Sequence, residues 1–343
     1  MGETVVTWDE SRVRDQITGV VADAEAALDG CVWPAHRLDD EITPADQMAL
    51  YVGSAGMIWG LRRLGSSLDL AALAAAALER YPEDAPDEER LSLFAGVPGL
   101  LLLTRTDDER LRALVHANER SPAWEILYGS PGTILAARAA GLADEAQRSL
   151  TILVDEWERH DWGLWDHVIV GHEFQSIGPA HGFVGNVHVL RGYVDDDALR
   201  AHTERVLRQY AVWSDDAVNW PPGPGHPVDR VQWCHGAPGI VATVGDLMPE
   251  DLLLGGAETT WRNGPLEKGP GLCHGTAGNG YALLKTYSVT GDEMWLERAR
   301  SFAVAALGQL QQRYSLMTGD IGAALFAQAC IDVDARFPIL DIV

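Results

Sequence analysis

The chain has 343 residues, 47% of them hydrophobic, and its 26 Lys and Arg against 50 Asp and Glu give a formal net charge of −24. This length can bury a large core, and it allows either two domains or one large domain built from repeats. A field this negative repels phosphate backbones, so we expect no nucleic acid among the partners.

The N-terminal stretch MGETVVTWDE has no basic segment followed by an apolar one, so we expect no secretory signal. The most apolar low-complexity run extends from Leu70 to Leu78, which is too short for a transmembrane segment. Four cysteines, two of them in Cys-His-Gly sequences, do not form the pattern of a disulfide framework. A reducing cytoplasm is therefore the expected compartment.

A Gly-x-x-Gly sequence occurs seven times, and each copy is followed by a mostly apolar segment. The copies begin at Gly53, Gly96, Gly129, Gly182, Gly236, Gly275 and Gly319. Segments with helical periodicity and a charged face lie between them, for example at residues 13–28 and 295–310. We predict that each repeat consists of an outer amphipathic helix, a glycine turn and a more uniformly apolar inner helix.

Three copies read Gly-x-Pro-Gly, with Pro98, Pro131 and Pro238. Because proline is favoured in the first turn of a helix, each turn is predicted at the start of an inner helix, with all seven at one end of the assembly. An open solenoid needs polar capping repeats, whereas the first and last copies here are as apolar as the middle ones. The predicted fold is all-α: one α/α-toroid domain over residues 1–343, with about seven inner and seven outer helices.

Copies four to six carry His181, His235 and His274 directly before their first glycine, and the latter two histidines follow Cys234 and Cys273. The scaffold role of the turn does not explain this clustering. Mixed sulfur and nitrogen ligands favour zinc, so we predict one zinc site made from neighbouring turns. Outside this pattern stand residues that we assign to packing: Cys31, Cys330, His116, His172, His188 and His202.

The sequences WCHGAPG at Trp233–Gly239, GLCHGTAGN at residues 271–279 and AHG at residues 180–182 resemble the signatures of the lanthionine synthetase C-like (LanC-like) family. The resemblance covers essentially the whole chain, down to Ala335–Pro338. It implies an α/α toroid of seven repeats, which agrees with the seven glycine turns. It also implies an enzyme that binds one zinc and joins a thiol to dehydroalanine or dehydrobutyrine as a thioether.

By the same resemblance, Cys234, Cys273 and His274 would be the zinc ligands. Three protein ligands would leave a fourth position for the substrate thiol, as a catalytic site requires. His181 stands at the family's acid/base position and would protonate the enolate that remains after the thiolate adds.

Further roles follow from matching positions. Glu125 stands where the family's cyclases carry Asp and its glutathione-adding branch carries Glu; a surface cap is the structural alternative. Arg230 matches a family Arg that would hold a substrate carbonyl or the enolate oxygen. His235 replaces the Tyr of many peptide cyclases and, like Lys268, resembles the glutathione branch. Lys268 would meet a glutathione carboxylate, and a solvated loop position is its structural alternative.

The leading hypothesis is zinc-dependent addition of a cysteine thiol to a dehydrated residue of a peptide, giving lanthionine-type links, with a dehydratase as a candidate partner. One alternative is the addition of glutathione to dehydrated peptides or proteins. Another is a zinc- and glutathione-binding module without turnover. A binding module has no need of His181, whereas an enzyme does. The Pro/Gly-rich run at residues 221–227 is predicted to be a surface loop over the site.

Overall fold

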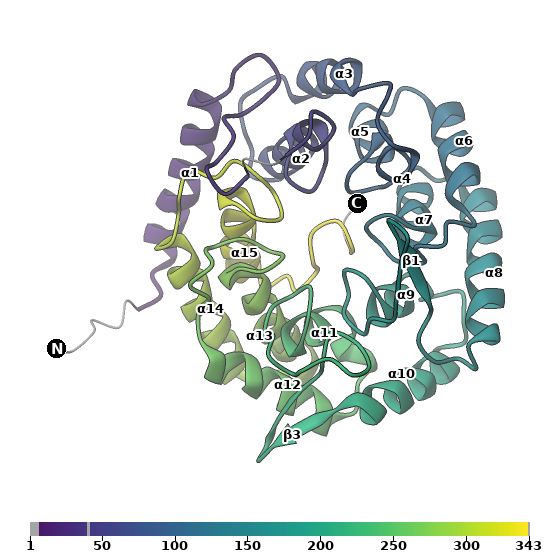
Figure 1. Ribbon diagram of the computed structural model, residues 1–343. Coiled ribbons are helices and arrows are strands. Elements are labelled where there is room, and N and C mark those ends of the chain that lie inside the picture. The colour runs from purple at the N-terminus through teal and green to yellow at the C-terminus, as the bar shows by residue number, and fades with distance from the viewer. Residues whose placement is uncertain (1–6, 40–41, 342–343) are drawn as a thin grey trace.

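The helices of this chain form two concentric rings (Figure 1). The computed structural model describes residues 7–39 and 42–341. The prediction about a secretory signal rests mainly on residues 1–6, which lie outside the described residues. Among the described residues, no helix combines the length and apolarity that a membrane span requires.

Within the described ranges, seven inner helices alternate with seven outer ones along the chain. The inner helices are α2 (Ser54–Arg63), α5 (Val97–Thr104), α7 (Ser130–Ala139), α9 (Phe183–Val189), α11 (Ala237–Val244), α13 (Thr276–Thr290) and α15 (Asp320–Asp332). The outer helices are α1 (Glu10–Ala26), α3 (Leu70–Arg80), α6 (Asp108–Asn118), α8 (Ala143–Arg159), α10 (Asp196–Tyr210), α12 (Glu250–Asn263) and α14 (Glu293–Leu307). The predicted α/α toroid is thus confirmed.

Short elements connect the helices. They are η1 (Asp46–Met48), α4 (Asp87–Arg90), η2 (Gly245–Leu247) and the strands β1 (His167–Ile169), β2 (His172–Phe174), β3 (Val212–Ser214) and β4 (Ala217–Asn219). Strand β1 pairs antiparallel with β2, and β3 pairs antiparallel with β4. The two hairpins were not predicted.

The two rings differ in burial as their sequence patterns require. Every residue of the inner helix α9 is buried. In the outer helix α8 the buried residues recur at intervals of one to four along one face: Ala146, Ser149, Leu150, Leu153 and Trp157. The apolar inner helices therefore form the core, and the amphipathic helices cover it.

The glycine turns stand at the N-terminal ends of the inner helices. The first glycine of each Gly-x-x-Gly sequence is the N-cap residue of the inner helix that follows. The second glycine permits close packing: a Cβ on Gly239 would collide with the carbonyl oxygen of Trp233, and one on Gly278 with that of Leu272.

Backbone hydrogen bonds join neighbouring turns through the residue two positions before the first glycine. The N–H of Cys234 donates to the carbonyl of Cys273 (3.0 Å), and that of Cys273 to Met317 (2.7 Å). The N–H of Met317 donates to Tyr51 (3.0 Å), and that of Tyr51 to Phe94 (2.9 Å). Since Met317 belongs to the last turn and Tyr51 to the first, this series closes the ring.

The C-terminal segment, residues 333–341, runs into the centre of the ring (Figure 1). Phe337 stacks on Trp233 with ring centroids 4.6 Å apart, and it meets Tyr281 edge-on at 5.0 Å. The segment therefore packs against the residue directly before Cys234.

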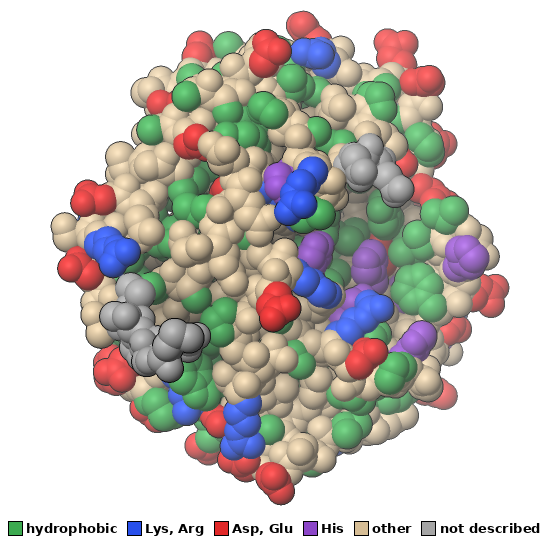
Figure 2. All heavy atoms as spheres, turned by 60° about the vertical axis from the view of Figure 1, so that its left-hand side comes forward, with side chains coloured by type: hydrophobic (Ala, Val, Ile, Leu, Met, Phe, Trp, Pro, Cys, Tyr) green, Lys and Arg blue, Asp and Glu red, His purple; other side chains and the backbone are tan. Residues whose placement is uncertain are grey.

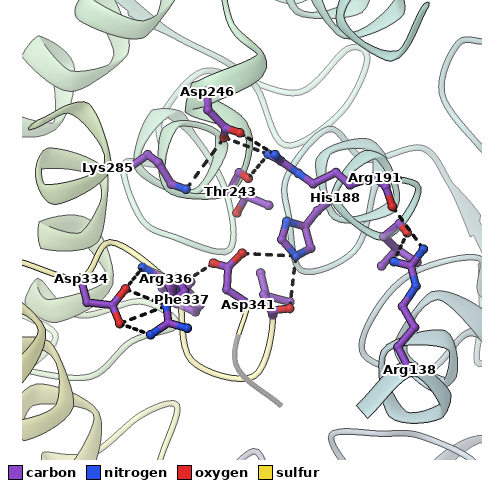
Figure 3. A network of polar contacts seen from close by, with 12 residues as sticks. Arg138, His188, Arg191, Thr243, Asp246, Lys285, Asp334, Arg336, Phe337 and Asp341 are labelled. Carbon is purple, nitrogen blue, oxygen red and sulfur yellow. Dashed lines mark hydrogen bonds and ion pairs between the residues drawn. The ribbon is translucent and has the colours of Figure 1, made fainter. Parts of the chain in front are cut away.

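A polar network holds this segment near the C-terminal ends of the inner helices (Figure 3). His188 of α9 lies 3.6 Å from a carboxylate oxygen of Asp341. Beside it, Arg191 and Lys285 both contact Asp246, which lies just beyond α11. These ion pairs connect the ends of α9, α11 and α13.

Replacing Gly60 by Ala is expected to destabilise the ring at its closure. Gly60 lies in α2, and a Cβ there would collide with Cγ2 of Ile321 in α15. A β-branched side chain in a helix has little rotamer freedom, so such overpacking costs about 1–3 kcal/mol. The thermal unfolding midpoint should fall.

Gly19→Ala is the matched control. Gly19 lies on the exposed face of the outer helix α1, where an added Cβ meets nothing within 4 Å. Alanine there should raise stability by about 0.5–1 kcal/mol. Equal midpoints for the two variants would contradict the close packing of α2 on α15.

Candidate functional site

Cys234, Cys273 and His274 come together at the N-terminal ends of α11 and α13. Their sulfur and imidazole ligand atoms all lie within 4.8 Å of one another. Both cysteines are buried and His274 is half-buried. We call these three residues the metal group. They meet because the hydrogen bond between Cys234 and Cys273 holds the two turns side by side.

The two sulfurs interact strongly. The pKa of the Cys234 thiol is lowered to about 4, chiefly because Cys273 donates a hydrogen bond to its sulfur. Burial acts to raise this pKa, and a second hydrogen bond, from His274, acts to lower it. The pKa of Cys273 is raised well above its ordinary range by the same hydrogen bond and by burial. One sulfur therefore carries a negative charge, and thiolate is the form that binds metals.

The donor set suits one divalent metal ion. Two sulfurs and one imidazole nitrogen match the ligands of tetrahedral zinc sites. In the described part of the chain the group has three members, and His235, next to Cys234, is not one of them. Three ligands would leave the fourth position of a tetrahedral ion to be filled.

Two residues that the sequence analysis missed touch the metal group. The buried Gln232 donates from Nε2 to the sulfur of Cys234 (2.9 Å) and accepts at Oε1 from the ammonium of Lys268 (2.7 Å). The hydroxyl of Tyr51 hydrogen-bonds to Cys273, which acts to lower the pKa of that thiol. Tyr51 occupies in the first turn the position that the two cysteines occupy in theirs, and this equivalence could have identified it.

Glu125 and His181 form a pair beside the metal group, with the carboxylate buried and the imidazole partly exposed. Oε2 of Glu125 lies 3.0 Å from Nδ1 of His181. The carboxylate is fully buried and also accepts from the N–H groups of Leu127 (3.0 Å) and Tyr128 (2.6 Å). Glu125 is therefore not a surface cap: it caps its own turn from inside and holds the histidine.

This pairing controls the charge of His181. Burial acts to lower the pKa of His181, but the hydrogen bond and the negative charge of Glu125 outweigh it and raise the pKa above its ordinary value of 6.5. The imidazolium form of His181 thus persists to a higher pH than in a free histidine. Because Nδ1 faces Glu125, Nε2 is the nitrogen that can give a proton to a substrate.

A cavity of about 480 Å³ opens at His181. His181 and His235 both line it, with ring centroids 6.2 Å apart, and Arg230 lines it as well. Pro222, Gly223 and His226 of the loop at residues 221–227 form part of its wall, as the sequence predicted. On the face shown in Figure 2, histidine and basic side chains gather beside a hollow that hydrophobic side chains surround.

The remaining predicted residues differ in their burial and in whether they line the cavity. Lys268 is exposed and held by Gln232, and it is not among the residues that line the cavity. Cys31 and Cys330 are buried, in agreement with a packing role. The assignment of His172 to packing is wrong, because this side chain is exposed and lines the cavity at the start of β2.

The profile of the family described as "Lanthionine synthetase C-like protein" matches residues 43–342. The chain belongs to this family. It is 31% identical over 285 residues to the "LanC-like protein GCL1" of Arabidopsis thaliana, covering 74% of this chain and 64% of that protein. It is 30% identical over 195 residues to the "Glutathione S-transferase LANCL1" of Danio rerio, covering 50% of this chain and 47% of that protein. The alignments thus span less than two thirds of each LanC-like relative.

A solved structure shares the toroid. The chain superposes on a structure named "Nisin cyclase" with a TM-score of 0.62 and 14% sequence identity, over 93% of this chain and 94% of the other. At this identity the likeness concerns the fold alone, and it agrees with the double ring of helices.

Glu125→Gln is expected to lower the pKa of His181. Without the carboxylate charge, burial dominates, and the pKa should fall below 6.5. In the unmutated protein the pKa of His181 is higher in the folded than in the unfolded state. The pair therefore contributes its full stability below the unfolded pKa, and this contribution is lost as pH rises through the folded pKa. The variant should lack this loss of stability on the alkaline side.

The measurement is an NMR titration of the histidine ring protons, with unfolding followed at several pH values. Glu119→Gln serves as control, since Glu119 pairs with the distant His116 and not with His181. A His181 titration unchanged in Glu125→Gln would show that the carboxylate does not set its charge.

Proposed function

We propose that this chain is an enzyme that forms carbon–sulfur bonds by zinc-dependent addition of a cysteine thiol to dehydroalanine or dehydrobutyrine in a dehydrated peptide. The product is a lanthionine-type thioether. The observation that carries this proposal is the position of the His181–Glu125 pair: His181 lines a cavity, and the pair lies beside a group of two cysteines and one histidine.

Cys234, Cys273 and His274 would hold the zinc. When bound, zinc lowers the pKa of a thiol presented to it, so that thiolate forms at neutral pH. Gln232, through its hydrogen bond to the sulfur of Cys234, fixes the orientation of that ligand.

His181 supplies the proton that the reaction needs. As the thiolate adds to the β-carbon, the carbon–carbon double bond opens toward the α-carbon and an enolate forms. His181 donates from Nε2 to the α-carbon, the thiol's own proton leaves to solvent, and His181 regains a proton from solvent, so that the net result is one S–H added across the double bond. Glu125 stabilises the imidazolium before this transfer. Arg230, on the cavity wall, can hold the enolate oxygen.

Glutathione as the thiol donor is the second candidate, and two observations favour it. One relative is named a glutathione S-transferase. In addition, Gln232, which lies two residues before Cys234, accepts a hydrogen bond from the ammonium of Lys268. This ammonium could meet a carboxylate of a thiol-bearing peptide. A zinc- and glutathione-binding module without turnover would share these features but would not need His181.

The metal content is the first test. We expect about one zinc per chain by elemental analysis, as a single ligand set implies. Cys273→Ala and His274→Ala should lose the zinc while circular dichroism shows little unfolding. Cys330→Ala, a buried cysteine in α15 outside the metal group, and His235→Ala should keep it. Unmutated, unchelated protein with almost no zinc would refute the metal site.

The second test separates catalysis from binding. His181→Ala should retain zinc, whereas thioether formation should fall by roughly 10²–10⁴-fold, the usual contribution of a general acid. The assay is mass spectrometry of a dehydroalanine-containing peptide, with cysteine in the peptide or added glutathione as donor. His226→Ala is the control, because His226 lines the same cavity without contacting Glu125 in the described structure.

Full activity of His181→Ala would remove this residue from the reaction. No activity of the unmutated protein with either donor, across several peptides, would favour the binding module.

A further inference from the structure

The turn between β1 and β2 contains a conformation that its sequence does not favour. Val170 and Gly171 connect the two strands, with φ of +50° and +74°. A two-residue hairpin turn with positive φ at both positions is normally Asn-Gly, because asparagine and glycine tolerate this region. A β-branched residue there is strained. Val170 is also 73% exposed, so contacts within the chain do not compensate for its conformation.

The base of this hairpin is firmly attached next to the candidate site. The ring of the buried His167 hydrogen-bonds to the carbonyl of Ala123, and the N–H of Val168 donates to the carbonyl of Pro122 (2.8 Å). Both acceptors directly precede the segment that carries Glu125. The base of the hairpin is therefore attached to the segment that leads to Glu125.

The tip forms an apolar wall of the cavity at His181. Ile169, Val170 and Phe174 line one part of it, and Pro222 lines another. No carboxylate is among its lining residues in the described structure, although the chain carries a net charge of −24. A peptide that presents a dehydrated residue to His181 would place a neighbouring side chain against this wall.

We propose that Val170 is a specificity-determining residue that packs against an apolar side chain next to the dehydrated residue of the substrate peptide. Strained backbone residues cluster at functional sites, and the strained residue here presents an exposed isopropyl group at the cavity. The inference rests on the proposed function, and it names the substrate class: dehydrated peptides with an aliphatic residue beside the dehydroalanine.

The test is Val170→Asn. Asparagine suits the turn, so the thermal unfolding midpoint should rise. The lost apolar contact should raise KM about tenfold for a peptide with Leu beside the dehydroalanine, with kcat unchanged within about twofold, since the contact is the same in the ground and transition states. For a peptide with Ser at that place KM should not change. Val170→Gly is the second variant, should the first fail to fold.

Val333→Asn is the matched control. Val333 follows α15 with φ of +55°, is 40% exposed and is not among the residues that line this cavity. Asparagine there should also raise the midpoint while leaving both KM values unchanged.

A binding measurement keeps this inference distinct from the proposed function. The probes are fluorescent peptides with Ala in place of dehydroalanine and either Leu or Ser beside it, measured by anisotropy. The unmutated protein should prefer the Leu peptide, and Val170→Asn should lose that preference. If this holds but no thioether forms, the reaction is wrong and the recognition site remains. Equal binding of both peptides by the unmutated protein, or an unchanged preference in Val170→Asn, would overturn the role of Val170.

Discussion

The series of backbone hydrogen bonds between neighbouring glycine turns is the interaction on which the candidate site depends. It joins Cys234, Cys273, Met317, Tyr51 and Phe94 through equivalent positions of successive repeats. Whatever side chain stands at this position is therefore delivered to the same end of the ring. Because these bonds involve only the main chain, the side chains at this position are free to differ, and the protein has cysteine in two neighbouring repeats and tyrosine in another.

The surroundings of the metal group keep it in place. Trp233, directly before Cys234, is fully buried and stacked on Phe337 of the C-terminal segment. Gln232 and Tyr51 hydrogen-bond to the two sulfurs. Preorganisation by packing and by hydrogen bonds to the ligands is what precise metal chemistry requires. The C-terminal segment thus supports the site from the centre of the ring, although it lies far from the cysteines in the sequence.

The repeated features of this protein could be predicted from the sequence, and the single contacts could not. Seven Gly-x-x-Gly sequences predicted seven inner helices because glycine and proline have strong local preferences at helix starts. Cysteines at equivalent positions of adjacent repeats predicted that they would meet. By contrast, Glu125 and His181 are 56 residues apart, and nothing local shows that the carboxylate is buried rather than a surface cap. Gln232 belongs to no repeated pattern, and His172 depends on a hairpin that its sequence does not signal.

The central claim is that three ligands from two neighbouring turns hold a metal ion with one position open to a thiol. The most direct measurement is the ultraviolet and visible spectrum of the cobalt-substituted protein during a titration with a small thiol. An open position predicts that added thiol increases the sulfur-to-cobalt charge-transfer absorption until about one equivalent is bound. A spectrum that does not respond to thiol would show a closed, structural site and would contradict the claim.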